Sequence, residues 1–279
     1  MSNDQPHAAN TVPGSLVQVG VTMKYTLLDY LRSRRFVIML AIVLIISALL
    51  TVLVAYYRPG SMVGSGATTI DFYSTWWGTF ASFLTVISGI FFGGDGIAAE
   101  FQNKTGYFTV PNPIRRSSIY IGKFLASFTA ATVVLVVYLA IAVANGLFYF
   151  GANIPSQFGE SFLFAWFYLL AVLGFTFMFS SLFKTSSYAI LVSFLLLIVG
   201  FSLISALIEG LTNTEPWYIL SYGASIIMDV FTSPYPTTIT RAGFTTYVAS
   251  IPEGLAIMAA YFIVSSMLGL ILFERKEFN

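Results

Sequence analysis

Six long apolar stretches, each long enough to cross a bilayer as a helix, are the feature that most constrains the fold of this chain. They cover residues 36–57, 73–97, 119–150, 161–183, 188–208 and 254–273. A helix needs about 20 mostly apolar residues to cross the hydrocarbon core of a bilayer. Only 9% of the 279 residues are charged, against about 25% in soluble domains. The sequence therefore predicts an all-α polytopic membrane protein with six transmembrane helices.

The lengths of the stretches and of their links predict two further details. The third stretch, residues 119–150, is longer than a bilayer requires, so that helix should tilt or project beyond the membrane. Residues 184–187 are a very tight link between the fourth and fifth stretches. Those two spans should form an antiparallel hairpin.

The positions of the basic residues predict the orientation. With the N-terminus inside the cell, eleven of the 13 Lys and Arg residues fall on cytoplasmic segments, and only Arg58 and Arg241 fall outside. Cytoplasmic loops of membrane proteins carry such an excess of positive charge. We therefore expect a multi-pass plasma-membrane protein with both termini in the cytoplasm.

The N-terminal region divides into a tail and a helix. Residues 1–14 are polar and predict a disordered tail that lacks the pattern of a signal peptide, whereas residues 15–279 form a single six-span domain. Met23 is an alternative start. Apolar residues at helical spacing predict an interfacial amphipathic helix over residues 15–35, with a helical run-in to the first span as the alternative. The basic residues that would anchor this helix to lipid headgroups are Arg32, Arg34 and Arg35.

The longest external segment covers residues 211–252 and contains four prolines. The apolar run at residues 217–229 within it is too short and too interrupted to cross the membrane. An unstructured connection of this length would be unusual. We expect at least one helix there, either partly buried on the outside of the bundle or re-entrant.

Several classes of chemistry are excluded by missing residues. The interiors of the spans hold no ionisable residue, which disfavours a proton-coupled carrier. The single histidine is His7 and there is no cysteine, so neither a Ser-His pair nor a Cys or His metal site is expected. The P-loop pattern G-x-x-x-x-G-K-[ST] is absent, so the chain should hydrolyse no nucleotide by that route. A net charge of +1 gives no indication of nucleic acid as a partner.

Small and aromatic residues in the spans each admit two interpretations. Gly89, Gly93 and Ala98 on the second span, with Ala142 and Gly146 on the third, favour close helix packing, and a gate or dimer seam is the alternative. Aromatic residues settle at membrane interfaces. An aromatic belt is therefore expected, with a substrate platform as the alternative, for the four tryptophans Trp76, Trp77, Trp166 and Trp217.

One polar island, residues 99–123, interrupts the apolar sequence. Residues 103–106 read as a turn, and residues 111–113 contain two prolines, which disfavour helix in the residue before each of them. Between these breaks lie residues 107–110, which are short and partly apolar. This pattern favours a short amphipathic element that plugs into a groove on a partner, and a solvated cytoplasmic loop is the alternative.

The order of residues in the island resembles the permease subunits of type-two ABC exporters. In that family a Glu near the end of span two is followed by a Gly-Thr turn, an apolar stretch, a Pro-Ile/Val-x-Arg step and a Gly-Lys at span three. The corresponding positions here are Glu100, residues 104–106, 107–110, 113–116 and 122–123. The family's Gly-Thr order is reversed in this chain.

The resemblance implies a division of labour between subunits. Such permeases act as homodimers, or as pairs of related subunits, and form the translocation path, while two separate cytoplasmic ATPase subunits hold ATP and Mg. The island would be the coupling helix that sits on the ATPase. The residues expected at this contact are Glu100, Lys104, Tyr107, Phe108, Pro113, Arg115, Arg116 and Lys123. For the arginines, anchoring to anionic headgroups is the alternative.

Two other functions stay open from the sequence. The chain could be a membrane anchor that transmits ATP-driven motion to an external protein through residues 211–252. It could also be a secondary carrier, which would transport without ATP along an ion gradient. A path without buried charge favours lipid-like, amphipathic or hydrophobic peptide cargo.

Overall fold

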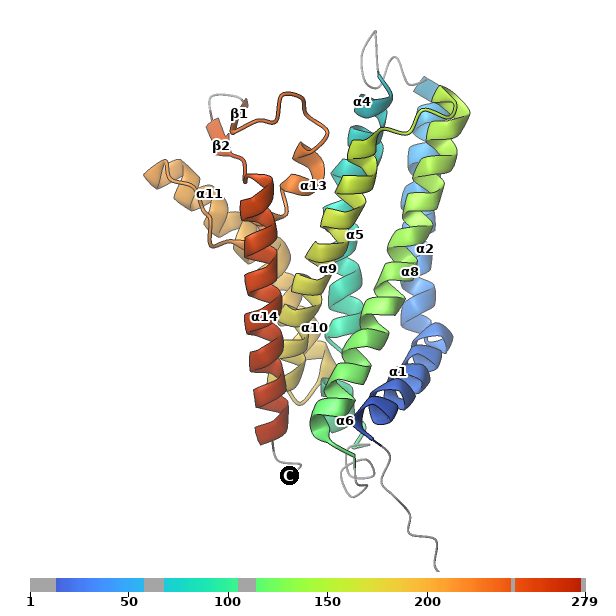
Figure 1. Ribbon diagram of the computed structural model, residues 1–279, viewed down its shortest axis with the longest axis vertical. Helices are drawn as coiled ribbons and strands as arrows, with labels where there is room; N and C mark the ends of the chain where they lie inside the picture. The colour runs from blue at the N-terminus through green and yellow to red at the C-terminus, as the bar shows by residue number, and fades with distance from the viewer. Residues whose placement is uncertain (1–13, 58–67, 105–113, 242–243, 277–279) are drawn as a thin grey trace, which may run out of the picture.

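The computed structural model describes residues 14–57, 68–104, 114–241 and 244–276, and shows an elongated bundle of helices (Figure 1). In this part of the chain, six helices are long and apolar enough to cross a membrane, which confirms the six-span prediction. The first, third, fourth and sixth spans are α2 (Arg34–Tyr57), α8 (Arg116–Phe150), α9 (Ser156–Leu182) and α14 (Ile251–Arg275). The second comprises α4 (Thr69–Tyr73), η1 (Ser74–Gly78), α5 (Thr79–Gly93) and α6 (Ala98–Gln102). The fifth comprises α10 (Ser186–Phe194), η2 (Leu195–Gly200) and α11 (Phe201–Thr212).

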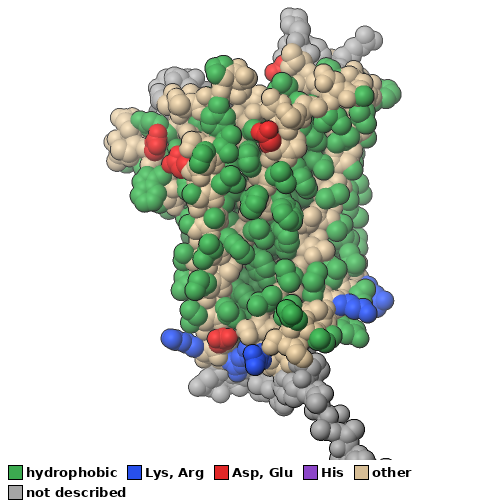
Figure 2. Space-filling view, viewed as in Figure 1, with side chains coloured by type: hydrophobic (Ala, Val, Ile, Leu, Met, Phe, Trp, Pro, Cys, Tyr) green, Lys and Arg blue, Asp and Glu red, His purple; other side chains and the backbone are tan. Residues whose placement is uncertain are grey.

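The two ends of the bundle differ in charge. Described Lys and Arg side chains gather at one end, which also holds α1 (Ser15–Arg32), α6 and the end of α14 (Figures 1 and 2). We call this the basic end, and the end that holds α4, α13 and the strands the opposite end. Apart from Arg241 on β1, the described basic residues lie at the basic end, which is the distribution that the positive-inside pattern predicts.

The inner layer consists of α5 and α9. In the apolar 18-residue stretch of the second and fourth spans, 67% and 61% of the residues are buried, whereas only 11% and 17% are buried in the corresponding stretch of the fifth and sixth spans. Gly89 and Gly93 allow the close approach, because an added Cβ would lie 2.4 Å from Val172 and 2.0 Å from Thr176 on α9. These two glycines therefore serve close packing of α5 against α9 within the chain.

The N-terminal helix α1 is separate from the first span. Ser33 adopts an extended conformation between α1 and α2, and α1 packs mainly against α8. Apolar side chains on its other side, including Val17, Val21 and Leu28, are exposed. This arrangement fits a helix that contacts lipid, and its position at the membrane interface stays a prediction.

The tight link between the fourth and fifth spans is confirmed. Helix α9 ends at Leu182, α10 begins at Ser186, and the two helices pack together. Helix α8 has 35 residues and is longer than any other described helix, as the sequence predicts for the third span.

The aromatic-belt prediction is wrong for Trp76 and Trp77. Both are buried in the bundle, at 2% and 0% exposure. They stack on the ring of Tyr138 at centroid distances of 5.1 and 5.4 Å, and Tyr138 Oη donates to the carbonyl of Trp76 over 2.5 Å. Trp77 Nε1 also donates to Ser161 Oγ. Because both rings stack on Tyr138 of α8 and Trp77 Nε1 has a partner on α9, these tryptophans pack in the core. Trp217, at 62% exposure, remains compatible with a belt.

The external segment contains more structure than the sequence predicted. Two helices of four residues each, α12 (Leu220–Gly223) and α13 (Ile226–Asp229), bury their apolar side chains, except that of Met228, against the spans. Two strands, β1 (Thr238–Arg241) and β2 (Phe244–Tyr247), pair as an antiparallel hairpin that an all-α prediction misses. The expected helix in this segment is therefore present as two short pieces on the outer part of the bundle.

Candidate coupling surface at the basic end

The predicted coupling residues lie at the basic end, around the junction of α6 and α8. Lys104 follows α6 with a positive φ of 55°, and Arg115 is the N-cap of α8. Tyr107, Phe108 and Pro113 lie outside the described residues. The structure therefore describes the two flanks of the predicted coupling helix.

Glu100 and Lys123 are paired with each other. Lys123 Nζ lies 2.5 Å from Glu100 Oε1, and the two side chains are only 13% and 15% exposed, Lys123 first. Lys123 Nζ also donates to the carbonyl of Gly96 over 3.0 Å. A shielded charge requires a partner of opposite sign. This pair joins α6 to α8 within the chain.

Ser180 on α9 holds the turn between α5 and α6. Its Oγ donates to the carbonyl of Gly94 over 2.9 Å and accepts the N–H groups of Ile97 and Ala98 at 3.0 and 2.9 Å. The first N–H groups of a helix have no partner inside that helix. One hydroxyl therefore satisfies the start of α6 and fixes it to α9.

The end of α5 is also tied to α1 and α8. Tyr30 Oη and Ser127 Oγ each donate to the carbonyl of Phe92 over 3.0 Å. Burial raises the pKa of the Tyr30 hydroxyl well above its ordinary value, so the hydroxyl stays protonated and acts as a donor. Arg35 Nη1 lies 2.5 Å from Asp95 Oδ2, which joins the start of α2 to the same turn.

The predicted lipid anchors therefore differ from one another. Arg32 and Arg34 are exposed at the α1–α2 junction, where contact with headgroups stays a prediction. Arg35 is 36% exposed in its side chain and pairs with Asp95, so its contact in this structure is with the chain itself.

The end of α14 is held by Arg116, which starts α8. Its Nη1 donates to the carbonyls of Glu274 and Lys276 over 2.8 and 2.9 Å, and more weakly to that of Phe273 over 3.4 Å. The last carbonyls of a helix lack intrahelical donors and carry partial negative charge, so a guanidinium is favourable there. Arg116 therefore binds α14 to α8.

Lys276 continues this connection to α9 and α6. Its Nζ donates to the carbonyls of Ser181 and Phe183, both over 2.8 Å, and lies 4.1 Å from the ring centroid of Phe101. Burial and the nearby charge of Lys184 lower the pKa of Lys276 to about 8. The C-terminal end of α14 is thus joined to three other helices.

These contacts involve residues that the sequence analysis did not select, namely Tyr30, Asp95, Ser127, Ser180 and Lys276. Hydroxyl groups on apolar helices carry no sequence signal that distinguishes a clamp from ordinary packing. Asp95 was visible as an acidic residue in a glycine-rich break, but its partner lies 60 residues away on α2.

A small polar cavity lies among these elements. It has a volume of about 330 Å³ between α1, the α5–α6 turn, α6 and α8. Three acidic side chains, Asp29, Asp95 and Glu100, line it together with Lys123 and with Tyr25. It lies beside the surface that the sequence predicts for partner binding.

The comparisons with known proteins agree with this architecture. The chain matches the family model described as ABC-2 family transporter protein over residues 23–278. A comparison with curated proteins gives no match. The match covers nearly the whole chain and all six spans. This chain therefore belongs to the ABC-2 family of transporter proteins and is a multi-pass ABC permease, a membrane component of transport.

Proposed function

We propose that this chain is the permease subunit of an ATP-driven exporter, and that it binds separate ATPase subunits at its basic end. The complex would contain two permease chains, identical or related, and two cytoplasmic ATPases that hold ATP and Mg²⁺. Both termini and the basic end would then lie in the cytoplasm of a plasma-membrane protein. The observation that carries this proposal is the set of contacts at the flanks of the predicted coupling segment, which joins α6 and α8 to each other and to α2, α9 and α14.

Through these contacts, a displacement of the predicted coupling segment would be transmitted to the helices of the bundle. Residues 105–113 are connected on one flank to α6 and on the other to α8. The Glu100–Lys123 pair joins these two flanks, and Ser180 joins α6 to α9. Displacement of the segment by an ATPase would therefore move α6 and α8 together, with the turn before Ala98 as the joint to α5. Coupling between distant sites travels through such packed and hydrogen-bonded elements.

The acidic cavity at the basic end supplies a place for a basic side chain of the ATPase. Asp95 and Glu100 are paired with Arg35 and Lys123, which leaves Asp29 as the lining carboxylate without an ion pair among the described residues. Charged groups at the rim of an interface set orientation and partner choice. In this proposal the Glu100–Lys123 pair holds α6 and α8 together beneath the interface, while Lys104 and Arg115 lie closer to the partner.

A replacement of residues 107–110 by Gly and Ser tests the proposal. The tagged full-length chain is purified from its native membrane with the ATP-hydrolysing subunit that accompanies it. We expect normal membrane insertion but loss of the ATPase from the complex, or loss of the dependence of its activity on the permease. The matched control carries the same replacement at the exposed loop residues 152–154, at the opposite end.

Unchanged capture and unchanged activity of the ATPase in the 107–110 variant would contradict the coupling proposal. The two rival functions give other results. A secondary carrier would transport along an ion gradient in vesicles without ATP. A membrane anchor would retain ATPase coupling and would depend on residues 211–252 for the capture of an external protein.

A further inference from the structure

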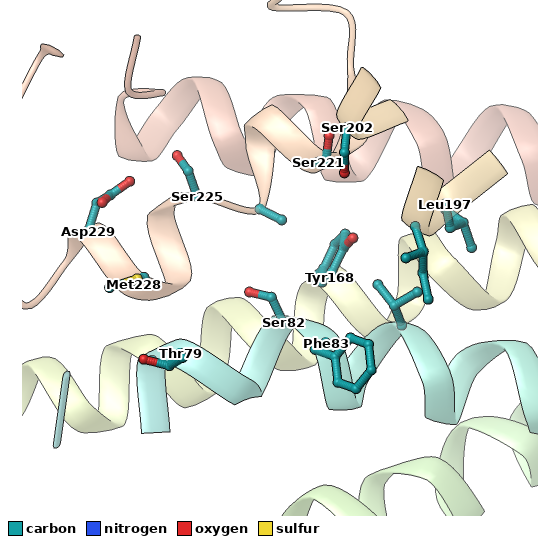
Figure 3. A pocket seen from close by; sticks show the side chains of 14 residues that line it. Thr79, Ser82, Phe83, Tyr168, Leu197, Ser202, Ser221, Ser225, Met228 and Asp229 are labelled. Atoms are coloured by element: carbon teal, nitrogen blue, oxygen red, sulfur yellow. The ribbon is translucent and has the colours of Figure 1, made fainter. Parts of the chain in front are cut away.

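A cavity lined by hydroxyl groups lies towards the opposite end of the bundle. It has a volume of about 360 Å³ and lies between α5, α9, the η2–α11 part of the fifth span and α12–α13 (Figure 3). Its size is in the range of small-ligand sites. Six hydroxyl-bearing residues line it: Thr79, Ser82, Tyr168, Ser202, Ser221 and Ser225. Polar groups at membrane depth are unfavourable unless they have a structural or functional role.

The hydroxyl groups come from opposite walls. Figure 3 shows Ser82 and Tyr168 on one side of the space, and Ser202 and Ser221 on the other. Asp229, which is 8% exposed, contributes a carboxyl group, and no Lys, Arg or His is among the described lining residues. The cavity therefore offers donors and acceptors from several directions without a positive charge.

One of these lining hydroxyls, that of Ser225, has no partner within the described chain. Its Oγ is buried and has no hydrogen-bond partner among the described residues. In the spans, the hydroxyls of Thr85 and Thr129 donate to the carbonyl four residues earlier, over 2.7 and 2.8 Å, whereas those of Ser88 and Ser193 are also buried without a described partner. A buried hydroxyl without a partner is unfavourable, and a bound ligand would satisfy it.

Both π-helical segments of the described chain border the cavity. Segment η1 ends at Gly78 and η2 contains Leu197 and Ile198, and all three residues line the space. An added Cβ at Gly78 would lie 3.3 Å from Met228 Cγ, so glycine leaves room for α13 at the rim. π-Helical turns are rare and occur frequently at functional sites. Their meeting here is a second observation that points to a ligand.

We infer that this cavity binds a polyhydroxylated group, such as a sugar or glycerol moiety. A polyol both donates and accepts at each oxygen, which complements serine, threonine and tyrosine hydroxyls. The Asp229 carboxylate accepts hydrogen bonds, and it would repel an anionic head group. Phe83 and Tyr168 supply apolar ring faces for the C–H side of such a ligand. The role of this ligand as cargo rests on the transport function proposed above, but its binding does not.

Photolabelling of the full-length chain in phosphatidylcholine nanodiscs tests the inference, since this lipid has no polyol head group. The probe is an octyl glucoside that carries a photoreactive diazirine in its chain. Two matched probes carry a trimethylammonium or a sulfate head on the same chain. We expect the glucoside probe to label peptides that contain residues 79–86 or 220–229, as read by mass spectrometry.

Two unlabelled competitors distinguish the source of the polyol. Competition by methyl glucoside as strong as that by octyl glucoside indicates a soluble polyol. Competition by octyl glucoside alone indicates an amphiphile such as a glycolipid. Either result supports the polyol class.

Hydroxyl deletions give the quantitative test. Loss of one neutral hydrogen bond weakens binding about 3- to 10-fold, so we expect the Ser82→Ala/Ser225→Ala variant to raise the Kd for octyl glucoside about 10- to 100-fold. Tyr168→Phe removes one hydroxyl with little change in shape and serves as the second variant. The control is Ser156→Ala, at an exposed serine of the opposite end.

Three results would overturn the inference: equal or stronger labelling of the cavity by the trimethylammonium probe, glucoside labelling only elsewhere, or an unchanged Kd in both variants. The measurement uses the permease without an ATPase. A failure of binding therefore leaves the coupling proposal intact, and a failure of ATPase capture leaves the binding result intact.

Discussion

At the basic end, Ser180 Oγ forms three hydrogen bonds, whereas towards the opposite end Ser225 Oγ is buried and forms none with the described residues. The same contrast holds for the charges. Glu100 and Lys123 neutralise each other, and Arg116 covers the carbonyls at the end of α14. In the hydroxyl-lined cavity, six hydroxyl-bearing side chains and one carboxyl surround an open space.

Ser180 and Ser225 illustrate two uses of polar groups in an apolar bundle, although the basic end also holds buried hydroxyls without a described partner, at Ser181 and Thr185. Where the helices must move as a unit, polar side chains join one helix to another. Where a ligand is to be held, polar side chains are left to face a cavity. On this account, polar deletions at the basic end should destabilise the chain, and deletions in the hydroxyl-lined cavity should not.

The largest effect is expected from Lys123→Met. The variant removes the ammonium group that pairs with the shielded Glu100 carboxylate, and the loss of one member of a buried pair costs about 3 kcal/mol or more. The double variant Glu100→Gln/Lys123→Met should be less destabilised than the single one, because it removes both charges of the pair. Unfolding of the purified chain in detergent measures the stability of both variants. Equal stability of the wild type and the single variant would contradict the contrast between the two ends.

The next effect is expected from Ser180→Ala. The variant leaves the N–H groups of Ile97 and Ala98 and the carbonyl of Gly94 without their hydroxyl partner. Unsatisfied buried groups of this kind cost about 1–3 kcal/mol. Ser187→Ala, at an exposed serine of the neighbouring helix α10, is the control and should change stability by less than about 0.5 kcal/mol. A Ser180→Ala variant that unfolds like the control would contradict the clamp.

A smaller, pH-dependent effect is expected from Lys276. Its pKa is lowered to about 8 in the folded chain, from an ordinary value of 10.5. Between these two pH values the folded chain holds fewer protons than the unfolded chain, so the free energy of unfolding should increase with pH across that window. Lys276→Met should reduce this increase. An identical pH profile for variant and wild type would refute the shift.

The smallest effect on stability is expected from Ser225→Ala. Since the hydroxyl has no described partner, its removal should leave the unfolding free energy within about 0.5 kcal/mol of wild type, or raise it slightly. A loss similar to that of Ser180→Ala would show that Ser225 is structural, and the contrast between the two ends would fail.

The sequence predicted the spans well and their contacts poorly. Hydropathy reports how many residues can cross a bilayer, so all six spans were identified within a few residues of their ends. It does not report which face of a span meets another helix. Trp76 and Trp77 were therefore assigned to an interface although they stack on Tyr138 in the core.

The candidate site shows the same limit. Glu100 and Lys123 were selected as charged residues of the polar island and were expected to face a partner. They lie 23 residues apart on different helices, and only the fold brings their side chains together. The hydroxyl-lined cavity is formed by residues from several spans, and no sequence motif marks it.

Site-directed cross-linking tests the central claim, that the basic end binds an ATPase, most directly. The chain has no cysteine, so a single cysteine can be placed at exposed Asn103 after α6, and another variant can carry one at exposed Ser156 at the opposite end. The account predicts that a photoreactive group at position 103 captures the copurifying ATP-hydrolysing subunit and that one at position 156 does not. Capture from position 156, with none from position 103, would contradict it.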